Sequence, residues 1–129
     1  MKTRKGYKTY PLTVAQKFHN YYAQYCPGKE ILNVGTSLTI EFELNIDELR
    51  KAIYKAYERC ESMRARLAYD RKEQKWYQYI TEKEDREIEF VDFTDKTMEE
   101  AEAEMTAWTR VPFDKEDEPM NRVVIIKTP

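Results

Sequence analysis

Few residues in this sequence could carry acid–base or nucleophilic chemistry, and they lie far apart. His19 is the only histidine. A catalytic histidine needs a positioned partner within hydrogen-bonding reach. No cysteine, carboxylate or second histidine lies three or four residues after His19. The spacing therefore favours a surface or half-buried histidine bonded to a neighbour over a general base, and we assign no catalytic residue.

Two arginines, Arg64 and Arg66, have the spacing of neighbours on one face of a β-strand. Met63, Ala65 and Leu67 alternate with them, which places the apolar side chains on the opposite face. If the arginine face is buried, at least one guanidinium group needs a carboxylate partner. If it is exposed, both arginines are solvated or pair with local glutamates, and such pairs contribute little to stability. The sequence leaves both interpretations open.

The other polar clusters have simpler explanations. Four glutamates between positions 99 and 104 could form an acid pair or a metal site, but such a run is more typical of a solvated helix face. Cys26 and Cys60 lack metal or redox spacing, which predicts two buried free thiols in a reducing compartment. The sequence contains no phosphate loop, Gly-x-Ser-x-Gly elbow or metal-ligand set. We therefore expect no metal or cofactor bound by this chain.

The composition describes one globular domain. The 129 residues are 41% hydrophobic and 36% charged, with a net charge of −2. This balance gives no support for a nucleic-acid or membrane partner, and no apolar run has the length of a transmembrane helix. Residues 1–10 are basic and no apolar run follows them, which predicts an extended or loose segment rather than a secretory signal. We expect a cytoplasmic protein whose domain covers residues 11–129.

Hydrophobic periodicity predicts the elements that position these residues. Helical spacing indicates three amphipathic helices, which begin near Val14, Ile46 and Thr94. Each has a capping residue followed three positions later by Gln or Glu: Thr13 with Gln16, Asn45 with Glu48, and Thr97 with Glu100. The apolar stripe of the first helix consists of Val14, Phe18, Tyr21, Tyr22 and Tyr25. Pro27 and Gly28 are predicted to end that helix.

Alternating residues predict the strands. Residues 34–42, the second helix and residues 63–67 together have the size of a strand–helix–strand crossover unit. Residues 76–80 are predicted to pair back on 65–69 as a hairpin, and residues 88–93 form a further short strand. Four consecutive apolar residues, 123–126, indicate a strand buried on both faces. The predicted fold class is α/β, a two-layer α+β sandwich with three main helices against a mixed, mostly antiparallel sheet.

Several segments resemble the condensation domains of nonribosomal peptide synthetases, a family with a chloramphenicol acetyltransferase-like fold. Residues 11–16 read Pro-Leu-Thr-Val-Ala-Gln and are similar to the family's Pro-Leu-Thr-x-Ala-Gln opening. Residues 58–67 resemble Glu-Arg-His-x-x-Leu-Arg-x-Arg-Phe, with Cys60, Met63 and Leu67 in place of His, Leu and Phe. Residues 111–114 and 118–123 resemble Arg-Pro-Phe-Asp and Gly-Pro-Leu-x-Arg-Val.

The resemblance implies that this chain is a partial N-terminal lobe of such a domain. In the family, a following strand ends in His-His-x-x-x-Asp-Gly. Its second histidine promotes attack by an amine or hydroxyl on an acyl thioester, which a carrier protein holds on a phosphopantetheine arm. That motif is absent from these 129 residues. The resemblance therefore implies half of the substrate cleft of an acyltransferase that forms amides or esters, inactive on its own.

The resemblance also implies a structural role for the arginine pair and names partners. Under this hypothesis, Arg64 or Arg66 holds an acidic residue of the adjoining catalytic loop. The expected partners are the remainder of the domain or a second chain that completes the sheet, and a carrier protein. An unpaired terminal strand at 123–127 also predicts self-association of the isolated chain. The alternative is a stand-alone, non-catalytic module that binds a carrier protein or partner chain.

Overall fold

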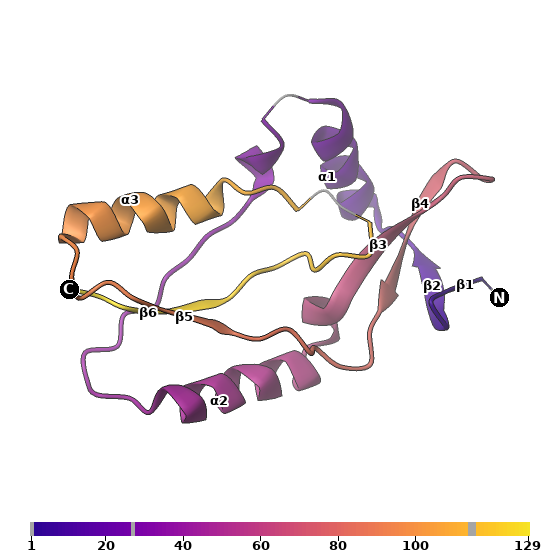
Figure 1. Ribbon diagram of the computed structural model, residues 1–129. Coiled ribbons are helices and arrows are strands. Elements are labelled where there is room, and N and C mark those ends of the chain that lie inside the picture. The colour runs from indigo at the N-terminus through magenta and orange to yellow at the C-terminus, as the bar shows by residue number, and fades with distance from the viewer. Residues whose placement is uncertain (1, 27, 114–115) are drawn as a thin grey trace.

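The computed structural model describes residues 2–26, 28–113 and 116–129, and it confirms a mixed α/β fold (Figure 1). The elements in chain order are β1 (Thr3–Arg4), β2 (Tyr7–Pro11), α1 (Val14–Tyr25), the 3-10 helix η1 (Lys29–Leu32), α2 (Ile46–Arg59), the 3-10 helix η2 (Glu61–Arg64), β3 (Ala65–Asp70), β4 (Lys75–Ile80), β5 (Glu89–Asp92), α3 (Met98–Thr109) and β6 (Val124–Lys127). One sheet is antiparallel with strand order β1-β2-β4-β3, and β5 and β6 form a separate parallel pair.

The antiparallel sheet contains the predicted hairpin. Strands β3 and β4 pair from Ala65 opposite Ile80 to Asp70 opposite Lys75. The other edge of β4 pairs with β2, so part of the segment expected to be extended or loose is an ordered strand. The turn between β1 and β2 has positive φ at both Lys5 (50°) and Gly6 (83°), as a two-residue hairpin turn requires.

The three main helices begin at the predicted capping residues. Thr13 and Thr97 each form the complete capping box with the residue three positions later. Asn45 accepts from the main-chain N–H groups of Asp47 and Glu48. Helix α3 begins at Met98 rather than near Thr94, because residues 93–97 form a turn instead. Pro27, predicted to end α1, lies outside the described residues, as does Asp114 of the 111–114 motif.

The main apolar core lies between α2 and the β5–β6 pair. Its buried members are Tyr57, Ile88 and Ile125, and half-buried residues of α2 pack against them. Helix α3 lies on the other side of the strand pair (Figure 1). Residues 123–126 are less buried than predicted: only Ile125 is fully buried, and within the described chain β6 pairs with β5 alone.

The predicted strand at 34–42 is wrong for this chain, and so is the crossover unit that needed it. The described residues provide no backbone–backbone hydrogen bond to residues 34–44. Val34 is 95% exposed and Leu38 is 87% exposed. The alternating pattern is that of a strand, but a strand forms only where a neighbouring strand supplies hydrogen bonds, and none lies alongside among the described residues.

Two further expectations about burial need correction. The apolar stripe of α1 is uncovered, and none of its helix residues is buried. Its exposed members are Val14, Phe18, Tyr21, Tyr22 and Tyr25. Both cysteines are free, but Cys60, the C-cap residue of α2, is exposed, and Cys26 is half-buried. No described helix has the length and apolar character needed to cross a membrane.

Candidate functional site: a buried arginine–glutamate network

The 3-10 helix η2 ends at Arg64 and β3 begins at Ala65, so of the two arginines predicted to share a strand face only Arg66 lies on the strand. Arg64 is 7% exposed and Arg66 is 6% exposed, and Ala68, on the same face of β3 as Arg66, is also buried. Ala65 and Leu67 on the opposite face are only half-buried. The arginines are therefore not solvated, and each guanidinium group needs hydrogen-bond acceptors within the protein.

Arg64 binds main-chain carbonyl groups. Its Nη1 donates to the carbonyls of Tyr57 and Glu58 in the last turn of α2, and its Nε donates to the carbonyl of Thr81 at 2.8 Å. The carboxyl end of a helix carries partial negative charge, so a guanidinium group is favourable there. Within the described residues, Nη2 of Arg64 makes no hydrogen bond and no carboxylate pairs with this arginine.

Arg66 pairs with Glu84, whose side chain is only 1% exposed. Arg66 Nη2 donates to Glu84 Oε2 at 2.9 Å, and Arg86 Nη2 donates to the same oxygen at 3.1 Å. Arg86 Nε lies 3.0 Å from Glu84 Oε1, an ion-pair distance without hydrogen-bond alignment. Burial raises the pKa of Glu84, but the hydrogen bonds from Arg86 and Arg66 outweigh it, so the net pKa lies below the ordinary value.

The same network reaches the segment that leads into β6. Arg86 Nη1 donates to the Asn121 carbonyl at 2.7 Å, and the Tyr57 hydroxyl donates to Asn121 Oδ1. Asn121 Nδ2 donates in turn to the carbonyl of Met63 at 2.8 Å. Side chains from α2, β3, the 81–88 connection and the approach to β6 thus form one network. Glu84 joins Arg66 to Arg86, and Arg86 joins this pair to Tyr57 and Asn121.

Sequence reasoning missed Glu84, Arg86 and Asn121. Glu84 and Arg86 lie in a connection where most residues are charged, Thr81 to Arg86, and such a segment is typical of a solvated loop. The one available signal was the prediction that a buried arginine face needs a carboxylate. That prediction did not identify which of the chain's 24 acidic residues supplies it.

The family model for the condensation domain matches residues 7–129, nearly the whole chain. The chain belongs to the condensation-domain family. It is similar in structure to the EpoB NRPS cyclization-docking bidomain from Sorangium cellulosum, solved in a rhombohedral crystal form, with a TM-score of 0.57 and 20% identity. The match covers 94% of this chain and 24% of that one, so the chain spans about a quarter of that protein's length. No curated protein matches.

Family membership confirms the resemblance read from the sequence, and the structural likeness agrees with the predicted condensation-type lobe. The family match begins at residue 7, four residues before the predicted start of the domain, and so includes β2. The roles predicted for Arg64 and Arg66 toward a catalytic loop stay predictions. The structure adds that Arg66 already has a carboxylate partner, whereas Arg64 binds carbonyl groups.

The remaining candidates in this condensation-domain chain bring no reactive groups together. His19 is exposed on α1, 6.0 Å from the Phe18 ring by centroid distance. Glu104 pairs with Lys96, and Glu100 completes the cap of α3. Over the described ranges, no three His, Cys, Asp or Glu side chains are grouped to hold a metal ion.

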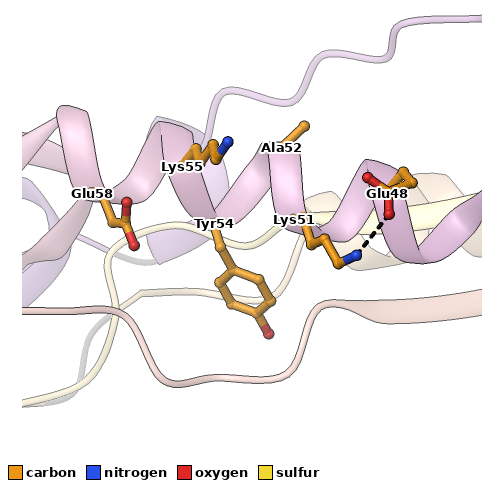
Figure 2. A pocket seen from close by; sticks show the side chains of 6 residues that line it. All are labelled: Glu48, Lys51, Ala52, Tyr54, Lys55 and Glu58. Carbon is orange, nitrogen blue, oxygen red and sulfur yellow. Dashed lines mark hydrogen bonds and ion pairs between the residues drawn. The ribbon is translucent and has the colours of Figure 1, made fainter.

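A depression on the surface of α2 has no chemistry of its own (Figure 2). Figure 2 shows the ring of Tyr54 among charged side chains of the same helix. The Tyr54 hydroxyl donates to the Arg86 carbonyl and accepts from the main-chain N–H of Ile88. Lys51 and Glu48 pair with each other at 2.6 Å. The polar groups that line this depression are therefore either hydrogen-bonded or paired within the protein, or exposed to solvent.

Proposed function

We propose that this chain is the N-terminal part of a condensation-type acyltransferase, which forms an amide or ester from an acyl thioester on a carrier protein. The observation that carries the proposal is the family match over residues 7–129. In this proposal the chain forms half of the substrate cleft. The chain has one histidine, so the paired histidines of the catalytic motif come from sequence outside these residues.

The proposal extends to partners and location. The partners are the rest of the condensation domain, or a second chain that completes the sheet beside β6, and a carrier protein with its phosphopantetheine arm. The location is the cytoplasm. One edge of β6 has no partner strand within the described chain, and this supports a partner that completes the sheet.

The geometry favours Arg64 over Arg66 as the residue that holds an acidic side chain of the catalytic loop. Arg66 is already neutralised by Glu84 at 2.9 Å. Arg64 has no described carboxylate partner, and its Nη2 makes no hydrogen bond to the described chain. A buried guanidinium group gains most from a carboxylate when its remaining N–H groups are unpaired.

The test is acyl transfer by the full-length protein, with Arg64→Ala and Arg66→Ala compared by soluble yield and by turnover of a carrier-bound acyl thioester. We expect Arg66→Ala to lower the yield of folded protein, because it leaves Glu84 buried with one arginine. We expect Arg64→Ala to lower turnover of the protein that does fold, and Arg64→Lys to restore it only in part. Unchanged yield and turnover in both variants would remove the assigned roles.

The stand-alone interaction module is the second candidate, and the uncovered stripe of α1 favours it. The reading frame beyond Pro129 separates the two. A His-His-x-x-x-Asp-Gly motif in frame supports the acyltransferase, and a natural stop codon supports the module. As a further check, the 129-residue chain alone should not accelerate acyl transfer, and measurable catalysis by it would contradict the proposal.

A further inference from the structure

Residues 2–6 fold onto the rest of the chain, although the family match begins only at residue 7. They contain β1 and the turn that leads into β2, and Figure 1 shows this hairpin at the end of the molecule away from the β5–β6 pair. Three cations of this segment pair with carboxylates that lie 68 to 113 residues further along the chain: Lys2, Arg4 and Lys5. The hairpin therefore links segments that are distant in the sequence.

Arg4 in β1 binds both carboxylate oxygens of Asp117. Its Nε donates to Oδ1 at 3.0 Å, and its Nη2 donates to Oδ2 at 2.7 Å. A two-point contact of this kind fixes the orientation of the carboxylate as well as its distance. Oδ1 also accepts from the hydroxyl of Tyr79 at 2.9 Å, and Tyr79 is only 1% exposed. Chiefly through the hydrogen bonds from Arg4, the pKa of Asp117 lies below its ordinary value, so the carboxylate is charged at neutral pH.

The main chain at Asp117 has a conformation that needs such support. Its φ of 63° lies in the left-handed region, which residues other than glycine rarely adopt. Its N–H donates to the carbonyl of Leu67 in β3 at 2.8 Å, and the neighbouring Glu116 accepts from the main-chain N–H of Tyr69 at 3.4 Å. Figure 1 shows the chain passing beside β3 here before it returns to β6. Contacts with β1, β3 and β4 together hold this bend.

The other attachment of the hairpin is more exposed. Lys2 pairs with Asp70 at the end of β3, at 2.8 Å, and with Glu73 in the β3–β4 turn. The side chains of Lys2 and Glu73 are each 43% exposed, whereas that of Asp117 is 15% exposed. Exposed ion pairs are screened by salt and contribute little, and less exposed pairs are screened much less. Of the two attachments, the one at Arg4 is therefore the one that can hold a distant segment in place.

We propose that the hairpin at residues 2–8 is an ionic strap that sets the path of the chain into β6. Arg4 holds Asp117 in its left-handed conformation against β3. Four residues later Arg86 holds Asn121, so the approach to β6 is fixed at two points. Opening the strap at Arg4 releases the first point and leaves the second in place. The approach to β6 thus has a held and a released state, and one ion pair selects between them.

Amide hydrogen exchange of the chain tests the strap. Arg4→Gln removes the charge and the two-point contact, and it should lower the protection of the amide at position 117 by at least about tenfold. The matched control is Lys2→Gln, which removes one positive charge from the same hairpin and should change that protection by less than about twofold. The amides of α2 should keep their protection in both variants, which shows that the core stays folded.

A second variant separates the ion pair from the backbone conformation. Asp117→Asn keeps a side chain that tolerates positive φ and removes the charge, so it should lower protection at position 117 as Arg4→Gln does. The double variant Arg4→Gln with Asp117→Asn should lose no more than about twofold beyond the larger single loss, because both changes remove the same interaction.

Four results would overturn the inference. The first is unchanged protection at position 117 in Arg4→Gln, and the second is an equal loss in Lys2→Gln, which would make overall charge the cause. The third is an equal loss in the amides of α2, which would make Arg4 a determinant of global stability. The fourth is a double variant whose loss is the product of the two single losses. None of these readouts involves acyl transfer, so the inference stands or falls separately from the proposed function.

Discussion

Glu84→Ala is the change that tests the buried network most directly. Among the residues that the structure describes, Glu84 is the only carboxylate paired with Arg66, and its side chain is 1% exposed. Removing it leaves the guanidinium group of Arg66, with 7% of its side chain exposed, without a counter-charge. Arg86 loses the same partner, but about a third of its side chain is exposed and it can turn toward solvent.

The expected cost follows from the burial of the pair. Breaking a buried ion pair by removing one partner costs about 3–5 kcal/mol, because an uncompensated charge stays inside. Proteins are stable by about 0.05–0.15 kcal/mol per residue, or roughly 6–19 kcal/mol for 129 residues. Glu84→Ala should therefore remove about a sixth or more of the free energy of unfolding. Arg86→Ala should cost less, about 1–3 kcal/mol, since Glu84 keeps Arg66.

The assay is urea unfolding followed by the fluorescence of Trp76 and Trp108. With a slope of about 2 kcal/mol per molar urea, the midpoint of Glu84→Ala should fall by about 1.5–2.5 M. The matched control is Arg66→Met with Glu84→Met, which removes both charges and should lie within about 1 kcal/mol of the parent or above it. The reasoning fails if Glu84→Ala shifts the midpoint by less than about 0.5 M, or if the double variant is no more stable than the single one.

Three further predictions concern acid, a helix cap and an exposed aromatic residue. Because the folded-state pKa of Glu84 is depressed, its contribution is present above the ordinary glutamate pKa of about 4.3 and is lost as pH falls through the lowered value. Unfolding measured from about pH 6 to 3 should therefore show a shallower loss in Glu84→Gln. Asn45→Ala should cost about 1 kcal/mol in urea unfolding, because two main-chain N–H groups lose their acceptor. Phe18→Ser should change the free energy of unfolding by less than about 0.5 kcal/mol and lower self-association in light scattering, since Phe18 is 60% exposed.

Local features of the fold could be predicted from the sequence. The helix caps and the 65–80 hairpin are each determined by residues close together in the chain. A short stretch of sequence therefore contains all the residues needed to predict them. Pairing of β2 with β4 could not be predicted, because Thr9 and Tyr79 are 70 residues apart and no local pattern joins them. The family resemblance gave the order of segments, but not the contacts between them.

The arginine face shows the limit of pattern reasoning more clearly. Alternation predicted that Arg64 and Arg66 share one strand face, and polarity suggested that this face could be solvated. The structure places only Arg66 on β3, with Arg64 at the end of η2, and it buries both side chains because Glu84 and the end of α2 supply acceptors. Both partners become visible only in three dimensions. Burial here is decided by available hydrogen-bond partners rather than by the hydrophobicity of the residues.

This chain buries several charged side chains and exposes several large apolar ones, and this contrast bears on how the chain is assembled with other polypeptides. Two arginines and a glutamate are less than 10% exposed, while Val34 and Leu38 are more than 85% exposed. Charged groups stay inside only when paired or hydrogen-bonded, and each large apolar side chain left in water forgoes about 1.5–3 kcal/mol. Arg66 and Glu84 already pair within the described residues, and their network fixes the approach to β6 through Arg86 and Asn121. The surfaces left unsatisfied, residues 34–42, the stripe of α1 and one edge of β6, are those that a further polypeptide would cover.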